Sequence, residues 1–307
     1  MQNLISYLQL CRFAAVFTAM ADIFLGYLLT QPDLSPSRDF GLLLAASSGL
    51  YLAGMVFNDI FDRNVDARER PNRPIPSGRV SLQGAAIFGA VLLAIGLVAA
   101  GLVGKQSAFV ATYLVGAIFL YDGLLKPTPL GPVAMGACRF LNVMLGASTA
   151  IDPSVGGPTN ASVWGHPQLH VALGLGIYIA GVTWFARKEA GTSSRWQLAG
   201  ALGVINLGVI FLAAFVLHWN DPDMIPRSWN AALILAAIGV IINHRLARAL
   251  VDPAPAKVQL SVRTLLMSLV MLDASIVFFV NENRLYAFAV VLLLVPAQAL
   301  ARFLAVT

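Results

Sequence analysis

Charge is scarce in this chain. Only 11% of its 307 residues are Asp, Glu, Lys or Arg, whereas 58% are hydrophobic and the mean hydropathy is +0.76. A soluble domain carries about 25% charged residues, so this composition excludes an ordinary soluble fold. The sequence therefore predicts an integral membrane protein that lives in a lipid bilayer.

Cysteine and histidine are also rare. The two cysteines, Cys11 and Cys138, lie in apolar runs without Cys-x-x-Cys spacing, so they are predicted to be buried free thiols outside any disulfide framework. The four histidines do not form a metal-binding pattern. The basic residues are spread over the loops between apolar segments. This distribution orients membrane proteins and argues against nucleic acid as a partner.

Ten apolar runs are long enough to cross a bilayer, which takes about 20 residues. Since only Asn281-Glu282-Asn283 separate the last two runs, nine spans plus one interfacial or re-entrant helix is the alternative. The predicted fold is all-α: one polytopic domain, residues 1–307, with nine to ten transmembrane helices around a central cavity. The runs cover residues 5–29, 40–58, 81–104, 107–125, 129–151, 168–187, 196–218, 229–250, 261–281 and 284–304.

The placement of Lys and Arg predicts the orientation. With ten spans and a cytoplasmic N-terminus, sixteen of the twenty basic residues fall in cytoplasmic loops, at the termini or within helices. Cytoplasmic loops are enriched in Lys and Arg, so both termini are expected on the cytoplasmic side of an inner cell membrane. Residues 58–79 are expected on the same side. The four basic residues left outside are Arg38, Lys105, Arg227 and Arg284.

The densest charge follows the second apolar run, in residues 58–79. If its helix continues, Asn58, Asp62 and Asp66 fall four residues apart on one face, with Asp59 beside them. Carboxylates this close repel one another unless a cation lies among them, and oxygen ligands suit Mg²⁺. Basic side chains that can bind a polyphosphate through forked hydrogen bonds follow. They are Arg63, Arg68, Arg70, Arg73 and Arg79, and the predicted ligand is a magnesium diphosphate.

Two motifs in this stretch occur together. Residues 58–66, NDIFDRNVD, followed by residues 73–78, RPIPSG, resemble the NDxxDxxxD and RPxPSG signature of the UbiA superfamily of intramembrane prenyltransferases. The pair is specific, although either motif alone would be weak. The resemblance implies a helical membrane enzyme that transfers an isoprenyl chain from its diphosphate to an acceptor, with the first acidic motif on the cytoplasmic side.

Ionisable side chains also occur within the apolar runs, where each costs roughly 2.5–3.5 kcal/mol on insertion scales. Arg12 lies in the first run, and Arg139 and Asn142 lie in the fifth. Asn142 is assigned to the substrate pocket. Arg12 and Arg139 are predicted to bind the diphosphate, and an equally weighted alternative pairs them with the intramembrane aspartates Asp22, Asp122 and Asp273.

Tyr121 and Asp122 lie near the end of the fourth run, and Lys126 directly follows it. The superfamily commonly has a Tyr here with a Lys shortly after it. The resemblance therefore implies that Tyr121 lines the pocket and Lys126 binds phosphate, while a plain cytoplasmic anchor is the alternative for Lys126. Asp122 is assigned to the same pocket.

The sixth run departs from the superfamily, which commonly has a second acidic motif, DxxxD, at its end. Here Thr183 and Arg187 stand where the two aspartates would be, and only Glu189 provides a carboxylate nearby. We expect Arg187 to bind the diphosphate directly in place of a second metal. The alternative is a member that binds prenyl diphosphate poorly. Together with Arg139 and Asn142, this change is similar to a divergent branch of the superfamily, and it implies no particular acceptor.

The predicted reaction is ionisation of a prenyl diphosphate, followed by capture of the carbocation by a small molecule such as an aromatic compound or quinone precursor. Asp62, Asp66 and Arg187 are the predicted catalytic residues, and Asp122 or Glu189 would take the released proton. A phosphotransferase of the CDP-alcohol type is disfavoured because residues 58–66 lack its DGxxAR-like arrangement. A transporter or lipid-binding membrane protein is the alternative outside the enzymes.

Overall fold

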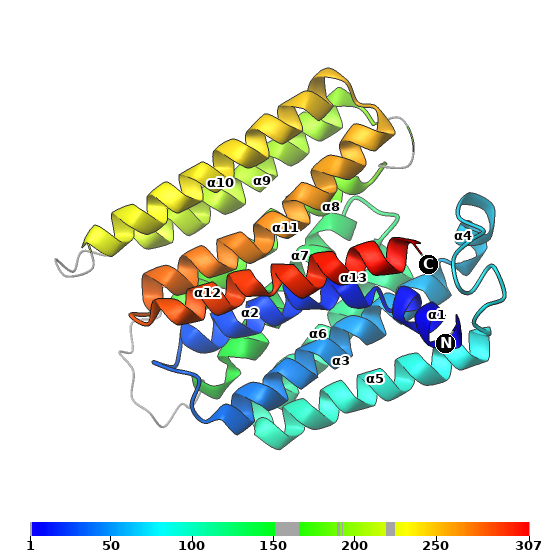
Figure 1. The fold of residues 1–307 in the computed structure, drawn as a ribbon, viewed down its shortest axis with the longest axis horizontal. Helices are drawn as coiled ribbons and strands as arrows, with labels where there is room; N and C mark the ends of the chain where they lie inside the picture. Colours follow the sequence, from blue (N-terminus) through cyan, green and yellow to red (C-terminus); the bar gives the residue numbers. More distant parts are fainter. Residues whose placement is uncertain (1, 151–165, 189–190, 192, 219–224, 307) are drawn as a thin grey trace.

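The computed structural model describes residues 2–150, 166–188, 191, 193–218 and 225–306. Within these ranges the chain is helical and contains no strand, as predicted (Figure 1). Glu189 lies outside the described residues. The elements are α1 (Gln2–Leu10), η1 (Phe13–Ala15), α2 (Val16–Leu28), α3 (Ser37–Phe61), α4 (Arg63–Glu69), α5 (Leu82–Val103), α6 (Lys105–Leu120), η2 (Tyr121–Leu125), α7 (Gly131–Gly146), η3 (Ala147–Ala150), α8 (Pro167–Ala186), α9 (Arg195–Leu217), α10 (Ile225–Val251), α11 (Pro255–Val280), α12 (Arg284–Leu292) and α13 (Leu294–Val306).

Eight helices of the described chain are long and apolar enough to cross a membrane, and the count is nine if α1 and α2 form one bent span. This number is compatible with the predicted nine to ten. The predicted run 129–151 accounts for the difference, because α7 has only 16 residues before it gives way to η3. The last run, Arg284–Leu304, is long enough to be a span.

The surface of the bundle is apolar where it would meet lipid. Along α5, Ile87, Val91, Ile95, Val98 and Leu102 are all half-exposed or more. Their spacing of three and four residues places them on one face of the helix. Only 22% of the apolar window of α5 is buried inside the protein. Such a stripe is stable in hydrocarbon, so the protein is an integral membrane protein.

Small residues bring the helices together. A Cβ atom added to Gly26 of α2 would lie 2.2 Å from the carbonyl oxygen of Val143 on α7, and one added to Gly49 of α3 would lie 2.8 Å from that of Leu92 on α5. Lipid provides no hydrophobic driving force for helix association, so van der Waals contacts between closely packed helix backbones stabilise the bundle. These contacts hold α2 against α7 and α3 against α5.

The first predicted span is broken at Arg12. This residue has φ 48° and ψ 47°, in the left-handed region, and α1 meets the following helix at 51°. A non-glycine residue in this region is strained and often marks a functional position. The bend carries the Arg12 side chain to the end of α3, where Asp59 accepts its hydrogen bond.

Candidate active site

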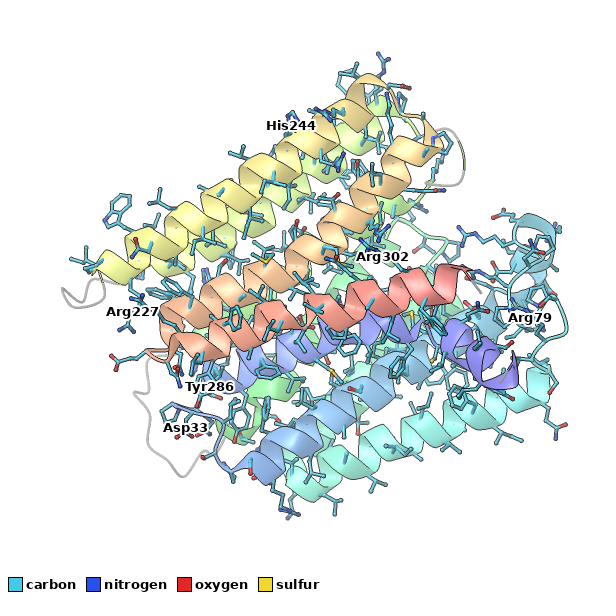
Figure 2. All side chains as sticks on the ribbon, in the orientation of Figure 1. Asp33, Arg79, Arg227, His244, Tyr286 and Arg302 are labelled. Carbon is cyan, nitrogen blue, oxygen red and sulfur yellow. The ribbon has the colours of Figure 1, made fainter. Side chains whose placement is uncertain are left out.

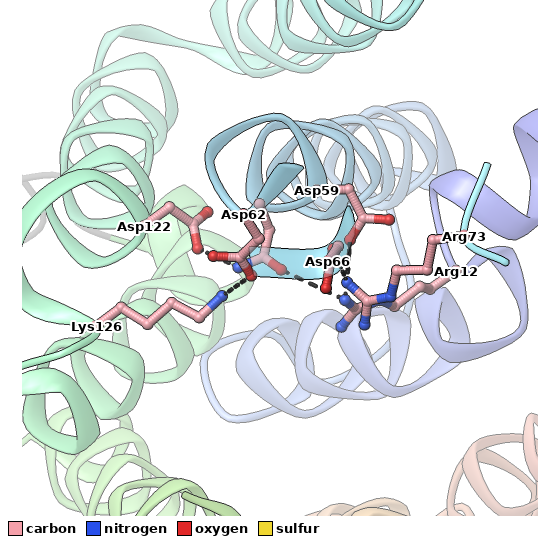
Figure 3. Close-up of polar contacts among 8 residues, drawn as sticks. Arg12, Asp59, Asp62, Asp66, Arg73, Asp122 and Lys126 are labelled. Atoms are coloured by element: carbon pink, nitrogen blue, oxygen red, sulfur yellow. Dashed lines mark hydrogen bonds and ion pairs between the residues drawn. The ribbon is translucent and has the colours of Figure 1, made fainter. Parts of the chain in front are cut away.

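The carboxylates of the 58–66 motif lie at one end of the bundle, where α3 stops and α4 begins. The helix does not continue unbroken as predicted, because Asp62 separates the two elements. The backbone hydrogen bonds still connect them: Asp62 N–H donates to Asn58 and Asp66 N–H donates to Asp62, both over 2.9 Å. The i, i+4 spacing of the motif therefore survives the break, and its side chains face a common mouth (Figure 3).

On one side of this mouth, two buried aspartates share an arginine. Arg73 Nη1 donates to Asp59 Oδ1 over 3.1 Å and to Asp66 Oδ2 over 2.5 Å. Arg12 Nη2 donates to Asp59 Oδ1 over 3.1 Å and to Asn58 Oδ1 over 3.4 Å. The side chain of Arg12 is 41% exposed whereas that of Asp59 is 5% exposed, so the bases face the open side.

On the other side, the partners come from η2 and the turn after it. Lys126 Nζ forms an ion pair with Asp62 Oδ2. Asn58 Nδ2 donates to Asp122 Oδ1 over 2.5 Å. Asn58 thus touches both sides of the mouth, since its carbonyl oxygen accepts from Arg12. Figure 3 shows the two groups facing each other below the end of α3.

This arrangement differs from the predicted metal set of Asn58, Asp59, Asp62 and Asp66. Their carboxylates are held by Arg12, Arg73 and Lys126, and Asp122 joins the group. In the part of the chain that the structure describes, no three His, Cys, Asp or Glu side chains are close enough to hold a metal by themselves. The donors that face the mouth are nevertheless carboxylate and amide oxygens, which fit Mg²⁺ chemically, with further ligands left to the substrate.

Arg187 lies beside this mouth, at the end of α8. Its Nη2 donates to the carbonyl oxygen of Pro127 over 2.5 Å, directly after Lys126. Just before Lys126, Tyr121–Leu125 form one π-helical turn, in which the Lys126 N–H donates to the Tyr121 carbonyl. Such turns are rare and are frequent at functional sites. This turn brings Lys126 and Arg187 to the same edge of the site.

A pocket leads from the mouth into the bundle. Tyr121 and Asp122 line its outer end, while Arg139 and Asn142 line it from α7. The rest of the wall is mostly apolar or small and comes from α2, α3, α6 and α7: Ala19, Tyr51, Gly54, Met55, Leu114, Ile118, Met135 and Cys138. Cys138 is therefore only partly buried, whereas Cys11 is buried as predicted, and both thiols are free.

Arg139 is placed away from the mouth. Its Nη1 donates to Asp22 Oδ2 over 2.5 Å and to the Thr18 carbonyl over 3.1 Å. Asn142 donates to the same Asp22 oxygen over 2.7 Å and accepts from Ser47. Of the two alternatives left open for Arg139, the structure has the pairing with Asp22. For Arg12 it has a pairing with Asp59, which the sequence did not single out.

Three other arginines of the 58–79 stretch donate hydrogen bonds to groups other than the carboxylates of the mouth. Arg63 donates to the Ile60 carbonyl and Arg68 to the Asn64 carbonyl. Arg79 donates to Gln9 Oε1 over 2.7 Å and to the Asn72 carbonyl over 2.6 Å, which fastens the loop to α1. A shallow groove beside Asp59 is lined by Arg12, Arg70, Arg73 and Arg79. Sequence spacing missed the contact of Arg79 with α1, because Gln9 lies 70 residues earlier in the chain.

Three comparisons with known proteins bear on the family and fold of this chain. Residues 19–306 match the UbiA prenyltransferase family. A digeranylgeranylglyceryl phosphate synthase of Methanopyrus kandleri is 31% identical over 269 residues, which cover 78% of this chain and 96% of that protein.

Solved structures share the fold. One, from work on digeranylgeranylglyceryl phosphate synthase in membranes, has a TM-score of 0.65 and 20% identity and covers 92% of this chain and 100% of its own. A UbiA homologue of Archaeoglobus fulgidus bound to GPP and Mg²⁺ has a TM-score of 0.62 and 19% identity and covers 93% of this chain and 99% of its own. The two motifs, the helical bundle and the matched length lead to one conclusion: this chain belongs to the UbiA prenyltransferase family.

Proposed function

We propose that this protein transfers the prenyl group of a prenyl diphosphate to a small-molecule acceptor within the membrane, in a Mg²⁺-dependent reaction. One observation carries the proposal: four aspartates and three bases face one another at the mouth of a pocket with a mostly apolar wall. The charged mouth suits a diphosphate, and the pocket suits a chain that water must not reach. Membership of the family argues against a transporter and against a CDP-alcohol phosphotransferase.

The bases of the mouth would bind the diphosphate. Arg73 already makes two charge-assisted hydrogen bonds to carboxylates, and its forked donors suit phosphate oxygens equally well. Arg12 and Lys126 reach in from either side. Arg187 would add its charge at the edge next to Lys126, in place of the second acidic motif.

The acids of the mouth would hold Mg²⁺. Asp62 and Asp66 are the carboxylates that we assign to it, with Asn58 and Asp59 completing the oxygen set. Bound there, Mg²⁺ would offset the negative charge that develops on the departing diphosphate. The carboxylates also form ion pairs with Arg73 and Lys126. These two side chains, which would bind the diphosphate, are therefore oriented before the substrate arrives.

The pocket would take the part of the substrates that must stay dry. Tyr121 and the apolar residues below it exclude water, which would otherwise capture the carbocation. Asp122 lies at the junction of mouth and pocket, where Asn58 holds its carboxylate. We assign it as the group that accepts the proton released by the acceptor, a role the sequence left open between Asp122 and Glu189.

The relatives suggest which acceptors to test. The Methanopyrus kandleri protein is named for a prenylated glyceryl phosphate. A glyceryl phosphate lipid is therefore one candidate acceptor, beside the aromatic and quinone-precursor acceptors that the resemblance suggests.

The positions of the basic residues support a membrane orientation. Figure 2 shows Arg79 and Arg302 toward the end that carries α4, and Arg227 toward the opposite end. Both chain ends lie on the α4 side in Figure 1. These positions support our proposal that the mouth faces the cytoplasm of a cell whose inner membrane holds the protein.

The reaction is tested with purified protein, geranylgeranyl diphosphate and Mg²⁺, with release of diphosphate as the readout. We expect release that EDTA abolishes and added Mg²⁺ restores, and prenylated product only when an acceptor is present. Farnesyl diphosphate and GPP would establish the chain length. Donor binding that is unchanged by EDTA, with no turnover for any acceptor, would contradict the proposal.

An inert carboxylate provides the control. Asp252 lies in the turn between α10 and α11, where its hydrogen bond and ion pair with Lys257 lower its pKa. Its side chain is 56% exposed, and it lies outside the mouth. The Asp252→Asn variant should therefore release diphosphate at the rate of the unaltered protein.

A further inference from the structure

Behind the wall of the pocket, three helices bring two aspartates and one arginine together. Asp22 of α2 and Asp273 of α11 are both 0% exposed. Arg139 of α7 donates to Asp22 Oδ2 over 2.5 Å. None of the three belongs to the mouth, so the proposed reaction leaves the two aspartates without a role.

The hydrogen bonds of this cluster are incomplete. Asp22 Oδ2 accepts from both Arg139 and Asn142. Asp22 Oδ1 and both oxygens of Asp273 are buried and accept no hydrogen bond from the described residues. Helices α2 and α11 pack directly against each other, and the buried carboxyl groups of Asp22 and Asp273 that they carry interact electrostatically. Two neighbouring carboxylates in a low dielectric do not both ionise, because their charges repel.

The net charge of the cluster also indicates that the aspartate pair holds one proton. With both aspartates ionised, Arg139 would leave one negative charge without a counterpart at bilayer depth, which is strongly unfavourable. One proton on the aspartate pair makes the cluster neutral. The same proton lets one carboxyl group donate to an oxygen of the other, which satisfies buried acceptors that otherwise have no partner.

We propose that Asp22 and Asp273 form a proton-binding site that holds one proton between them, and that Asp22 thereby positions Arg139 and Asn142 on the pocket wall. Both side chains line the pocket, and Asp22 is the acceptor that they share. Two further hydrogen bonds fix these side chains: Ser47 donates to Asn142, and Arg139 donates to the Thr18 carbonyl. Asp22 is a positioning residue, since it acts on the substrate through these neighbours.

The proton is tested by infrared spectroscopy of the full-length protein, which separates the carbonyl stretch of a carboxylic acid from that of a carboxylate. The difference spectra of Asp273→Asn and of Asp22→Asn against the unaltered protein should each show the loss of one carboxylic acid band. In either variant the remaining carboxylate and Arg139 neutralise each other, so the proton leaves. The control Asp252→Asn changes an exposed, ionised carboxylate and should lose no such band.

Two results would overturn the shared site. If the band survived in Asp22→Asn, Asp273 would be protonated through its burial alone. If neither variant lost a band, no proton would be held there. A third variant, Arg139→Leu, removes the cation, and we expect it to gain a band because neutrality then needs a second proton. Since these spectra do not depend on turnover, they stand even if the proposed reaction fails.

The positioning role rests on the proposed function and is tested by kinetics. Asp22→Leu removes the acceptor of Arg139 and Asn142, so we expect KM for the prenyl diphosphate to rise about tenfold while kcat changes less than about threefold. Asp22→Asn keeps a carbonyl oxygen for both donors and should restore KM to within about threefold. An unchanged KM in Asp22→Leu would overturn this role. If that variant does not fold, Asn142→Leu removes one positioned side chain, and an unchanged KM there has the same meaning.

Discussion

The protein uses aspartate and arginine twice, at the mouth and behind the pocket wall, with opposite results. At the mouth, the Arg73 side chain is 20% exposed and shares Asp59 and Asp66. Behind the wall, Arg139 is 11% exposed and its partner Asp22 is fully buried. Both arginines make one hydrogen bond of 2.5 Å to a carboxylate.

The difference lies in access to water and ligand. A partly exposed ion pair contributes little to stability, so its members are free to exchange partners for a diphosphate and a metal. A buried pair is held in place because removing one partner leaves an uncompensated charge. The mouth should therefore control activity and the buried cluster should control stability. The following predictions test that division, from the largest expected effect to the smallest.

The largest effect is expected for Asp62→Ala. This change removes a carboxylate that we assign to Mg²⁺ and frees Lys126 from its ion pair. The rate of diphosphate release should fall about 10³-fold, since charge stabilisation at the leaving group is lost. The thermal unfolding temperature should stay within a few degrees of that of the unaltered protein, because the pair is partly exposed. A large loss of stability with normal turnover would reverse our assignment.

Arg139→Leu should have the converse effect. It leaves Asp22 without the guanidinium that accompanies it, and a broken buried pair costs about 3–5 kcal/mol of folding stability. Thermal unfolding of the purified protein, followed by circular dichroism, measures this loss. The double variant Asp22→Leu/Arg139→Leu removes both charges and should recover most of the stability. If the double variant were no more stable than the single one, the pair would not be the cause.

Arg73→Lys tests the geometry of the mouth rather than its charge. A lysine keeps the positive charge and one nitrogen to take the place of Nη1, which donates to both Asp59 and Asp66, but it lacks the other guanidinium nitrogens that would bind phosphate oxygens in a fork. We expect the kcat/KM for the prenyl diphosphate to fall about 30-fold, which corresponds to roughly 2 kcal/mol. The same change at Arg68, which bonds a backbone carbonyl on α4, is the matched control and should leave kcat/KM unaltered.

The smallest effect is expected for Arg187→Gln. Its side chain is exposed and lies at the edge of the mouth, where it donates a hydrogen bond to the Pro127 carbonyl. Loss of one charge there should weaken prenyl diphosphate binding about tenfold or less, as measured by fluorescence titration. Arg195→Gln removes a similar exposed arginine that donates to the Val251 carbonyl, away from the mouth, and should bind normally. Equal affinities in the two variants would contradict a direct contact of Arg187.

The aspartate motif shows how much of the site the sequence predicted. Spacing alone placed Asn58, Asp62 and Asp66 on one side of the chain, and that prediction holds because the backbone hydrogen bonds continue through the break at Asp62. The same spacing did not reveal that Asp122 would join Asn58, because 64 residues separate them. The bend at Arg12 was missed for another reason: an apolar run carries no signal for a left-handed residue inside it.

The sequence by itself determined that this protein lies in a lipid bilayer and that its ligand is charged. Its apolar runs require a bilayer, and its paired motifs require a charged ligand at one end of them. Only the tertiary structure decided which charges neutralise one another. Arg12 and Arg139 both lie within apolar runs of the sequence, yet helix packing sets Arg12 at an open mouth and buries Arg139 against Asp22. Partner choice depends on distance and desolvation, and both exist only once the helices have packed.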